Sequence, residues 1–360
     1  MASITVTAKR HPVISSPVTA KVERVSSSIA LKDRATGQSV PAQIISDGEI
    51  VWIENLALGE CREYELVEDA TPVSGVELVE KDDQVQFLIG GELFTSYHFK
   101  GGEDFVRPFL WPVFGPDRLR VTRNFPMDKT VEGEKTDHKH HRSIWVAHGD
   151  INGADNWSEE ANCGSQQHQE FLEKASGPVF GRIKSLNFWL DNAGNKQLEE
   201  ERTITIYNLP DSGRLVDLEV VFTATEGDVN FGDTKEGGIA SVRVDTTMDG
   251  ERGGLIANAI GGITEAENWG KPAHWVDYAG PVEGRTVGIS IFDTPGNFRY
   301  PTRWHVRDYG LFAANPFALA SYLDDPSVDG GHVVKAGEAF PFRYRIFIHD
   351  GDTRSAEVKK

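Results

Sequence analysis

Phe342-Arg343-Tyr344-Arg345-Ile346-Phe347-Ile348 is a stretch in which apolar side chains occupy every second position. Successive side chains of a β-strand point to opposite faces, so four of these side chains would share one face of an extended chain. The same alternation recurs over residues 186–190, 203–206 and 217–222, and turn-forming segments such as residues 191–195, 210–213 and 329–331 lie between such stretches. The sequence therefore predicts an all-β protein.

Glycine and aromatic residues are abundant, with 36 Gly, 19 Phe and 8 Trp among 360 residues, a composition typical of β proteins with many turns. We expect a large antiparallel structure of two layers over residues 76–352. A small β unit is expected over residues 1–70, joined through residues 68–75, which have the composition of a linker. The one segment with helical character is residues 158–174, where Glu and Gln recur at intervals.

Charge and hydropathy restrict the class of function. The formal net charge is −18, which opposes binding to nucleic acid or to an anionic membrane and favours neutral small molecules or glycans. No apolar run reaches 18 residues, and the first ten residues lack the apolar core of a signal peptide. We therefore expect a cytoplasmic protein. Motifs for nucleotide binding, serine hydrolysis and zinc proteolysis do not occur, so no nucleotide cofactor is expected.

Histidines gather in the run Asp137-His138-Lys139-His140-His141-Arg142. Imidazole binds metals, transfers protons and hydrogen-bonds hydroxyl groups near neutral pH. In an extended segment His138, His140 and Arg142 would share one face, and a bulge at His140 and His141 would bring the three histidines together. A solvated basic turn is the alternative. The nearby Trp145, His148 and Asp150 favour a site.

A second candidate lies in residues 230–238, where Lys235 and Glu236 precede two glycines. Glycines permit close approach of the backbone, and an acid–base pair beside them could transfer protons. Charged residues are also common in solvated glycine turns, and that interpretation is the more frequent one.

Two later segments mix aromatic and polar side chains. Residues 268–278 present flat aromatic faces and polar groups, which suits a hydroxylated ring, although a core strand would explain the same pattern; the residues are Trp269, Lys271, His274, Trp275, Asp277 and Tyr278. In residues 302–310, Arg303, His305 and Arg307 would share a strand face. Such a face needs partners, which a polar ligand surface or plain solvent would supply.

Several of these motifs together resemble the PmoA-related family of bacterial domains, over roughly residues 76–350. The segments that carry the resemblance are residues 107–116, 121–126 and 137–153 with Trp157, then Gly237-Gly238, residues 269–271, 275–278 and 304–310, and Asn315-Pro316. Members usually have Pro where Lys139 stands and an aromatic residue where Asn156 stands. The resemblance implies a galactose-mutarotase-like β-supersandwich and a role with oxidised (3-keto) sugars or glycosides.

The leading hypothesis is a cytoplasmic carbohydrate-active enzyme that cleaves a glycoside or 3-keto-glycoside by hydrolysis or β-elimination. His138, His140 and His141 would act as acids and bases or hold a divalent metal, and Glu236 or Asp277 would be a base. Lys235, Arg142 or the metal would stabilise an oxyanion. The side chains expected to contact the sugar are Arg142, His148, Asp150, Trp157, Lys235, Lys271, Trp275, Tyr278, Trp304, His305 and Arg307.

Two alternatives stay open. A mutarotase-type epimerase needs one acid and one base and no metal, and a histidine with Glu236 would suffice. A sugar-binding module without chemistry would use the aromatic faces, but it has little need for so many titratable groups.

Overall fold

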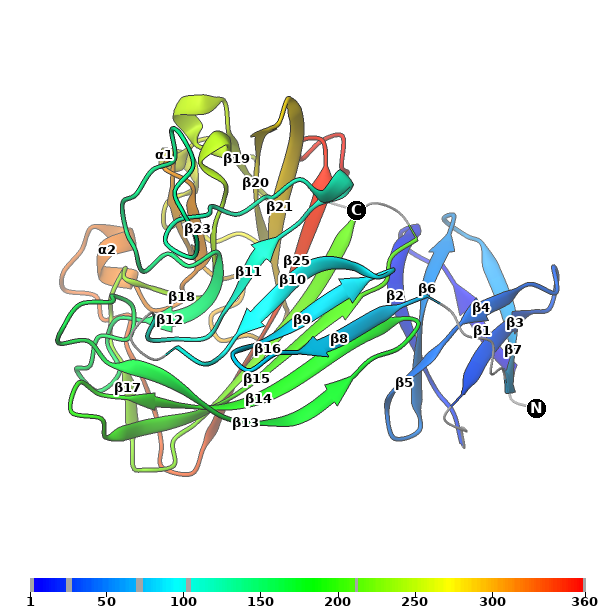
Figure 1. Cartoon of the computed structure of the whole chain (residues 1–360), viewed down its shortest axis with the longest axis horizontal. Helices are drawn as coiled ribbons and strands as arrows, with labels where there is room; N and C mark the ends of the chain where they lie inside the picture. Colours follow the sequence, from blue (N-terminus) through cyan, green and yellow to red (C-terminus); the bar gives the residue numbers. More distant parts are fainter. Residues whose placement is uncertain (1–2, 24–27, 69–73, 102–104, 211–212, 359–360) are drawn as a thin grey trace.

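The computed structural model of the chain describes residues 3–23, 28–68, 74–101, 105–210 and 213–358. Its main body is a sandwich of two eight-stranded sheets whose strands pair antiparallel (Figure 1). The first sheet has the order β22-β23-β18-β12-β11-β10-β9-β8. Its strands are β8 (Val76–Glu80), β9 (Gln84–Ile89), β10 (Glu92–His98), β11 (Phe109–Val113), β12 (Ile144–His148), β18 (Gly237–Arg243), β22 (Trp304–Arg307) and β23 (Leu311–Ala314).

The second sheet has the order β13-β14-β15-β16-β25-β21-β20-β19. Its strands are β13 (Ser165–Ala175), β14 (Phe180–Leu190), β15 (Lys196–Tyr207), β16 (Arg214–Thr223), β19 (Leu255–Asn258), β20 (Trp275–Val282), β21 (Arg285–Asp293) and β25 (Ala339–Asp350). Apolar side chains from both sheets form one continuous core between the layers. The predicted all-β, two-layer antiparallel architecture is confirmed.

The alternation at the end of the sequence produces the central strand β25. Phe342, Tyr344, Ile346 and Ile348 are buried in the core between the sheets. Arg343 and its alternate neighbours lie on the outer face of the second sheet. Each buried apolar side chain of this size contributes about 1.5–3 kcal/mol to folding, so this face holds the strand in register.

Two local predictions fail. Residues 158–174 do not form a helix, because most of this segment is the edge strand β13, which pairs with β14 along its length. In β14 the inward positions are Ser185, Asn187 and Trp189, and the apolar residues at 186, 188 and 190 lie on the half-buried outer face. Some of the inward polar groups are paired: Glu200 accepts the indole N–H of Trp189 over 2.7 Å, and the side-chain amide of Asn187 donates to Ser185 over 3.2 Å.

Two smaller sheets lie beside one end of the sandwich (Figure 1), in the orders β1-β7-β3-β4 and β2-β6-β5. Their strands are β1 (Ser3–Thr7), β2 (Val13–Lys21), β3 (Ile29–Asp33), β4 (Ser39–Pro41), β5 (Gln43–Ser46), β6 (Glu49–Leu56) and β7 (Cys61–Glu68). They enclose a separate apolar core. Gln43 joins them to the sandwich through hydrogen bonds with the backbone of Val179 and Phe180. The predicted linker falls mostly on residues 69–73, which lie outside the described residues.

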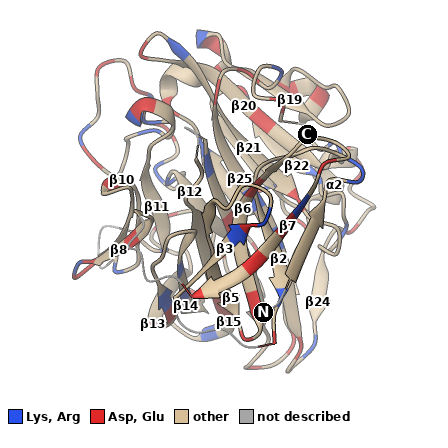
Figure 2. Cartoon of the chain, turned by 90° about the vertical axis from the view of Figure 1, so that its right-hand side faces the viewer, with Lys and Arg blue, Asp and Glu red and all other residues tan. Residues whose placement is uncertain are grey.

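Helical structure is sparse in the described part of the chain. The short helices are η1 (Pro116–Arg118), η2 (Thr246–Met248), η3 (Gly250–Arg252), α1 (Glu265–Asn268) and α2 (Leu319–Leu323), and a two-stranded sheet joins β17 (Val229–Phe231) to β24 (His332–Val334). Among the described residues there is no helix of the length and apolar character needed to cross a membrane. Figure 2 shows acidic and basic segments interspersed along strands and loops rather than gathered in one area.

Candidate functional site

The histidine run forms a turn that leads into β12. His138 has a left-handed backbone (φ 44°), and its carbonyl oxygen accepts a hydrogen bond from the backbone N–H of His141 over 3.0 Å. The turn gathers one ring nitrogen from each of His138, His140 and His141 within 4.8 Å of one another. The three histidines therefore do meet, but through a turn and not through the extended segment with a bulge that the sequence led us to expect.

Two buried arginines, Arg123 and Arg243, bind this turn through hydrogen bonds. Arg123 donates to the carboxylate of Asp137 over 2.7 Å and to the carbonyl oxygen of His138 over 2.6 Å. Arg243, the last residue of β18, donates to Asp137 over 2.8 Å and to Nδ1 of His141 over 3.0 Å. Because the carboxylate of Asp137 binds both guanidinium groups, it fixes the arginines, and the arginines in turn fix the histidine turn.

Arg142, predicted to contact the substrate, has a structural position instead. Its guanidinium forms a two-pronged ion pair with Glu159, with N–O distances of 2.7 and 2.8 Å, and it lies over the rings of Phe105 and Phe109. Arg107 shares Glu159 and also donates to the carbonyl oxygen of His140 over 3.1 Å. This pair of arginines ties the histidine turn to the segment around residue 159.

Aromatic rings surround the histidines. Tyr309, His138, His141 and Trp145 form a stacked series with successive ring centroids 5.1, 4.7 and 5.3 Å apart. Trp157 lies at the centre of the group, with its ring 6.0 Å from His140, 5.6 Å from His141 and 5.5 Å from Trp145. The indole N–H groups of both tryptophans are buried and have no acceptor among the described residues.

The segment carrying His305 completes the cluster from the other side. The imidazole of His305 stacks on Trp157 with centroids 6.0 Å apart and meets Trp269 edge-on at 5.0 Å. Arg307 lies over the ring of Trp269 at 3.7 Å, and Glu265 holds its guanidinium. The predicted strand at this position is confirmed as β22, and His305 and Arg307 do face the same group of aromatic rings.

Lys235 and Glu236 form an ion pair with each other, and both side chains are a little under half exposed. Their charges act on the cluster: Glu236 on His138 and Tyr309, and Lys235 on His305. The loop is fixed by the backbone N–H of Gly149, which donates to the carbonyl oxygen of Glu236 over 2.7 Å. The acid–base pair therefore lies close enough to the histidines for its charges to influence their pKa values.

The histidines of the cluster are held neutral at physiological pH. Burial, together with the charge of Arg107, lowers the pKa of His140 to about 3. Burial, together with Arg307 and Lys235, lowers the pKa of His305 to about 3. Burial also lowers the pKa of His138, and lowers the pKa of His141 well below its usual value. A neutral imidazole can donate one hydrogen bond and accept another, or it can act as a base.

Several predicted residues do not join the cluster. Asp277 is fully buried in β20, where its carboxylate accepts hydrogen bonds from His349, Ser290 and Thr353. Its neighbour Tyr278 donates to the carbonyl oxygen of Asp308 over 2.8 Å. These contacts give both side chains a role in packing the second sheet, not one beside the histidines.

Others support the site from behind or lie apart from it. His148 is buried against Phe231 and Phe317 and bonds the carbonyl oxygen of Gly232, and burial lowers its pKa to about 4. Asp150 accepts a hydrogen bond from the backbone N–H of Gly153 in a turn, and Trp304 is a core residue whose indole donates to the carbonyl oxygen of Ala273. Lys271 is exposed, and Trp275 packs on Phe292.

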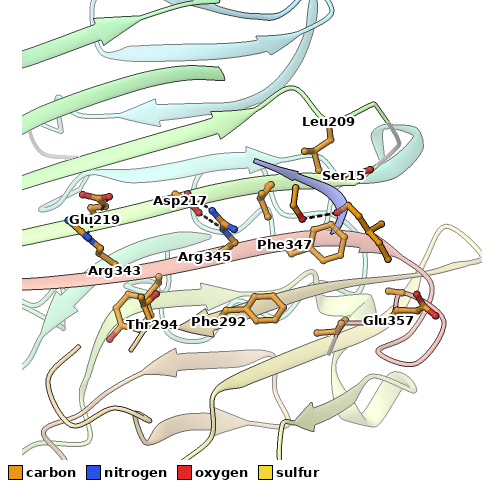
Figure 3. A pocket seen from close by; sticks show the side chains of 16 residues that line it. Ser15, Leu209, Asp217, Glu219, Phe292, Thr294, Arg343, Arg345, Phe347 and Glu357 are labelled. Atoms are coloured by element: carbon orange, nitrogen blue, oxygen red, sulfur yellow. Dashed lines mark hydrogen bonds and ion pairs between the residues drawn. The ribbon is translucent and has the colours of Figure 1, made fainter. Parts of the chain in front are cut away.

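A pocket of about 620 Å³ lies elsewhere, on the outer face of the second sheet next to β2 and the C-terminal segment (Figure 3). Its charged side chains are largely paired: Asp217 with Arg345, and Glu219 with Arg343 (Figure 3). The residues that line it include neither histidine nor cysteine. The groups suited to acid–base chemistry therefore lie in the histidine cluster and not in this pocket.

The sequence pattern gave no role in the site to Asp137, Tyr309, Arg123 or Arg243, and it indicated Trp145 only as a neighbour of the histidines. Asp137 and Trp145 lie next to the histidine run, and Tyr309 lies within residues 302–310, so their closeness in sequence to these motifs could have indicated them. Arg243 had only its position as a lone cation ending an apolar segment. Its link to His141 depends on the pairing of β12 with β18, where its backbone N–H donates to the carbonyl oxygen of Ser143 over 2.8 Å.

Comparison with known proteins adds a family but no activity. No curated protein matches the chain. Residues 84–360, more than three quarters of the chain, match the model of a family of unknown function, DUF6807. That description names neither the PmoA-related domains nor the mutarotases, so the finer resemblance stays a prediction. The extent of the match nevertheless places the chain plainly: it belongs to the DUF6807 family of unknown function.

Proposed function

We propose that this chain is a cytoplasmic carbohydrate-active enzyme that cleaves a glycoside or 3-keto-glycoside at the histidine cluster. The observation that carries the proposal is the convergence of His138, His140, His141 and His305 around Trp157, with the Lys235–Glu236 pair beside them. Titratable groups with displaced pKa values that gather in one place, and come from distant parts of the sequence, are typical of catalytic sites.

A sugar ring suits the chemistry of these surroundings. Tyr309 and Trp269 are only partly buried and offer flat apolar faces, against which the C–H groups of a sugar can pack. Neutral imidazoles supply both donors and acceptors for hydroxyl groups. A net charge of −18 is compatible with a neutral ligand.

In the proposed reaction Glu236 is the base and Lys235 or a histidine is the acid. A keto group acidifies the neighbouring C–H bond, so a carboxylate can remove that proton while negative charge moves to the carbonyl oxygen. When the carbonyl re-forms, the electron pair of the enolate makes a new C=C bond conjugated with it, and the glycosidic C–O bond breaks. The acid protonates the departing oxygen. Hydrolysis of an unoxidised glycoside would use the same acid and base with water.

The test is turnover of a panel of glucosides and galactosides, each offered both as the plain glycoside and as its 3-keto form, with products identified by mass spectrometry. Release of an aglycone or a monosaccharide supports the proposal. A product of unchanged mass indicates epimerisation, and bound but unconverted sugar indicates a binding module; either result contradicts it. His140→Ala should abolish turnover. His11→Ala, at an exposed position in the N-terminal part of the chain, should not.

A further inference from the structure

We infer that His141 is a neutral hydrogen-bond donor to the carbonyl oxygen of a keto substrate, and that Arg243 is the residue that positions it. The inference rests on the proposed function for the identity of the substrate as a sugar. Its structural part rests on one contact, the hydrogen bond between Arg243 and Nδ1 of His141.

Arg243 fixes the tautomer of His141. A guanidinium has five N–H donors and no acceptor, so Nδ1 of His141 must present its lone pair toward Arg243. A neutral imidazole carries a single N–H, and with Nδ1 accepting, that hydrogen is on Nε2. Nε2 makes no hydrogen bond with the described residues, and ring nitrogens of His138 and His140 lie within 4.8 Å of a ring nitrogen of His141. The Nε2–H therefore has no acceptor among the described residues and is left to bond a ligand.

The same contact opposes a metal ion bound by all three histidines. A histidine that ligates through Nε2 normally keeps its hydrogen on Nδ1 and donates it to a carboxylate or a carbonyl oxygen. Here Nδ1 faces a donor, so binding through Nε2 would require either an imidazolate or two opposed N–H groups. Binding through Nδ1 would require the loss of Arg243 from its place. Both alternatives work against a divalent cation at His141.

The surrounding charges favour an oxygen that gains negative charge. The charges of Arg243 and Arg123 act on His141, whose ring is stacked on His138 and meets His140 edge-on. Asp137 neutralises only part of the two guanidinium charges. A cation held against Nδ1 also makes the Nε2 hydrogen a stronger donor, because it draws electron density from the ring. Neutral imidazole acting as an electrophile toward a substrate carbonyl is an established way to stabilise an enolate.

The step balances without another reactant. The substrate C–H bond next to the ketone breaks, and its proton goes to the carboxylate of Glu236. The electron pair forms a C=C bond, and the carbonyl π electrons move to oxygen. The Nε2–H of His141 strengthens its hydrogen bond to that oxygen but keeps its proton. A hydroxyl oxygen can also accept this bond, but only a carbonyl oxygen gains the negative charge that the bond stabilises, so this step requires the keto form.

The test reads the tautomer directly, by two-bond ¹H–¹⁵N correlation spectra of the full chain labelled in histidine and purified without a histidine tag. The His141 signals are assigned as those that disappear in His141→Asn. At pH 7.5 we expect an unprotonated Nδ1 and a protonated Nε2. Arg243→Met should shift both nitrogens toward the mixed values of a ring that exchanges between tautomers. Should Arg243→Met fail to fold, the wild-type spectrum alone decides the tautomer. A protonated Nδ1 in the wild-type protein would overturn the inference.

Zinc provides the second arm. Added Zn²⁺ should leave the Nε2–H signal of His141 in place, and binding of any Zn²⁺ should be unchanged in His141→Asn. Stoichiometric Zn²⁺ that removes the Nε2–H signal would overturn the assignment of His141 as a donor.

These readouts need no substrate, so they separate this inference from the proposed function. If the predicted tautomer is found but no glycoside is turned over, the proposed function is contradicted and the assignment of His141 stands. If plain glycosides are turned over as fast as their 3-keto forms, only the requirement for a ketone is contradicted. Once a keto substrate is known, His141→Phe should lower kcat by about 100- to 1,000-fold, as for other lost oxyanion donors.

Discussion

The carboxylate of Asp137 accepts a hydrogen bond from Arg243 over 2.8 Å, through the same guanidinium that donates to His141. The arginine is almost fully buried, whereas the carboxylate is about two-fifths exposed. A surface carboxylate thus controls the orientation of a buried cation, and through it the hydrogen on a buried imidazole. The geometry of the candidate site depends on a residue that itself need not contact a ligand.

Asp137→Asn tests this dependence. Arg123 and Arg243 both donate to Oδ1 of Asp137, so an amide oxygen in its place can still accept both hydrogen bonds, but it carries no negative charge to compensate the two guanidinium groups. We expect the free energy of unfolding in urea at pH 7 to fall by about 1–3 kcal/mol. Glu132→Gln, at an exposed position of the same segment, is the matched control and should change stability by less than about 0.5 kcal/mol. Equal effects of the two variants would show that Asp137 has no special role.

Glu236→Gln separates catalysis from stability. The side chain is 42% exposed and forms an ion pair with Lys235, so the free energy of unfolding should change by less than about 0.5 kcal/mol. Removal of a general base should lower kcat by about 100- to 10,000-fold, with little change in KM. Glu338→Gln, an exposed carboxylate elsewhere, is the control and should keep full turnover. A Glu236→Gln enzyme with normal kcat would transfer the role of base to a histidine.

Gly149→Ala tests the loop that carries the acid–base pair. A β-carbon at this position would lie 2.6 Å from the carbonyl oxygen of Glu236, closer than van der Waals contact permits. The backbone of residue 236 must therefore move, and the hydrogen bond from the N–H of residue 149 must lengthen. We expect kcat to fall by at least about tenfold, because small misplacements of reacting groups are costly. Unchanged kinetics would mean that this loop is not part of the reaction.

The sandwich could be predicted because its strands obey a local rule. Phe342, Tyr344 and Ile346 alternate with polar or outward residues, and each inward position meets the core. Strand β14 breaks this rule: Ser185, Asn187 and Trp189 face inward, and Trp189 donates to the buried carboxylate of Glu200 in the neighbouring strand β15. A partner on a neighbouring strand is not revealed by any spacing along β14.

The histidines could be predicted because they are close together in the sequence, and His305 because it alternates with apolar neighbours. The assignment of Asp277 as a base had no comparable support. Its neighbours in sequence are aromatic and polar, as at a binding site, but its partners come from β21 and the C-terminal segment. Residues that depend on long-range strand pairing, Arg243 above all, are beyond the reach of local patterns.

The Asp277–His349 pair gives a prediction of pH dependence. Both side chains are buried, and Nε2 of His349 lies 3.0 Å from the carboxylate of Asp277. Burial lowers the pKa of His349, but the hydrogen bond and charge of Asp277 outweigh it and hold the pKa above its usual value. A raised pKa means that the folded state binds the proton more tightly than the unfolded state. The stabilisation is thus complete below about pH 6.5, the usual value for histidine, and is lost as the pH rises through the folded-state pKa.

His349→Gln should therefore lower the free energy of unfolding most at low pH. Glutamine can still donate one hydrogen bond to Asp277 but carries no charge, so we expect the free energy of unfolding to fall by about 1–3 kcal/mol at pH 6. At pH 9 the wild-type histidine is closer to neutral and the gap should narrow. His11→Gln, an exposed histidine, should show no such trend. Urea unfolding of the three proteins at pH 6, 7.5 and 9 measures the gap directly. A gap that stays constant across this range would mean that His349 is neutral throughout, and that Asp277 holds it by hydrogen bonding alone.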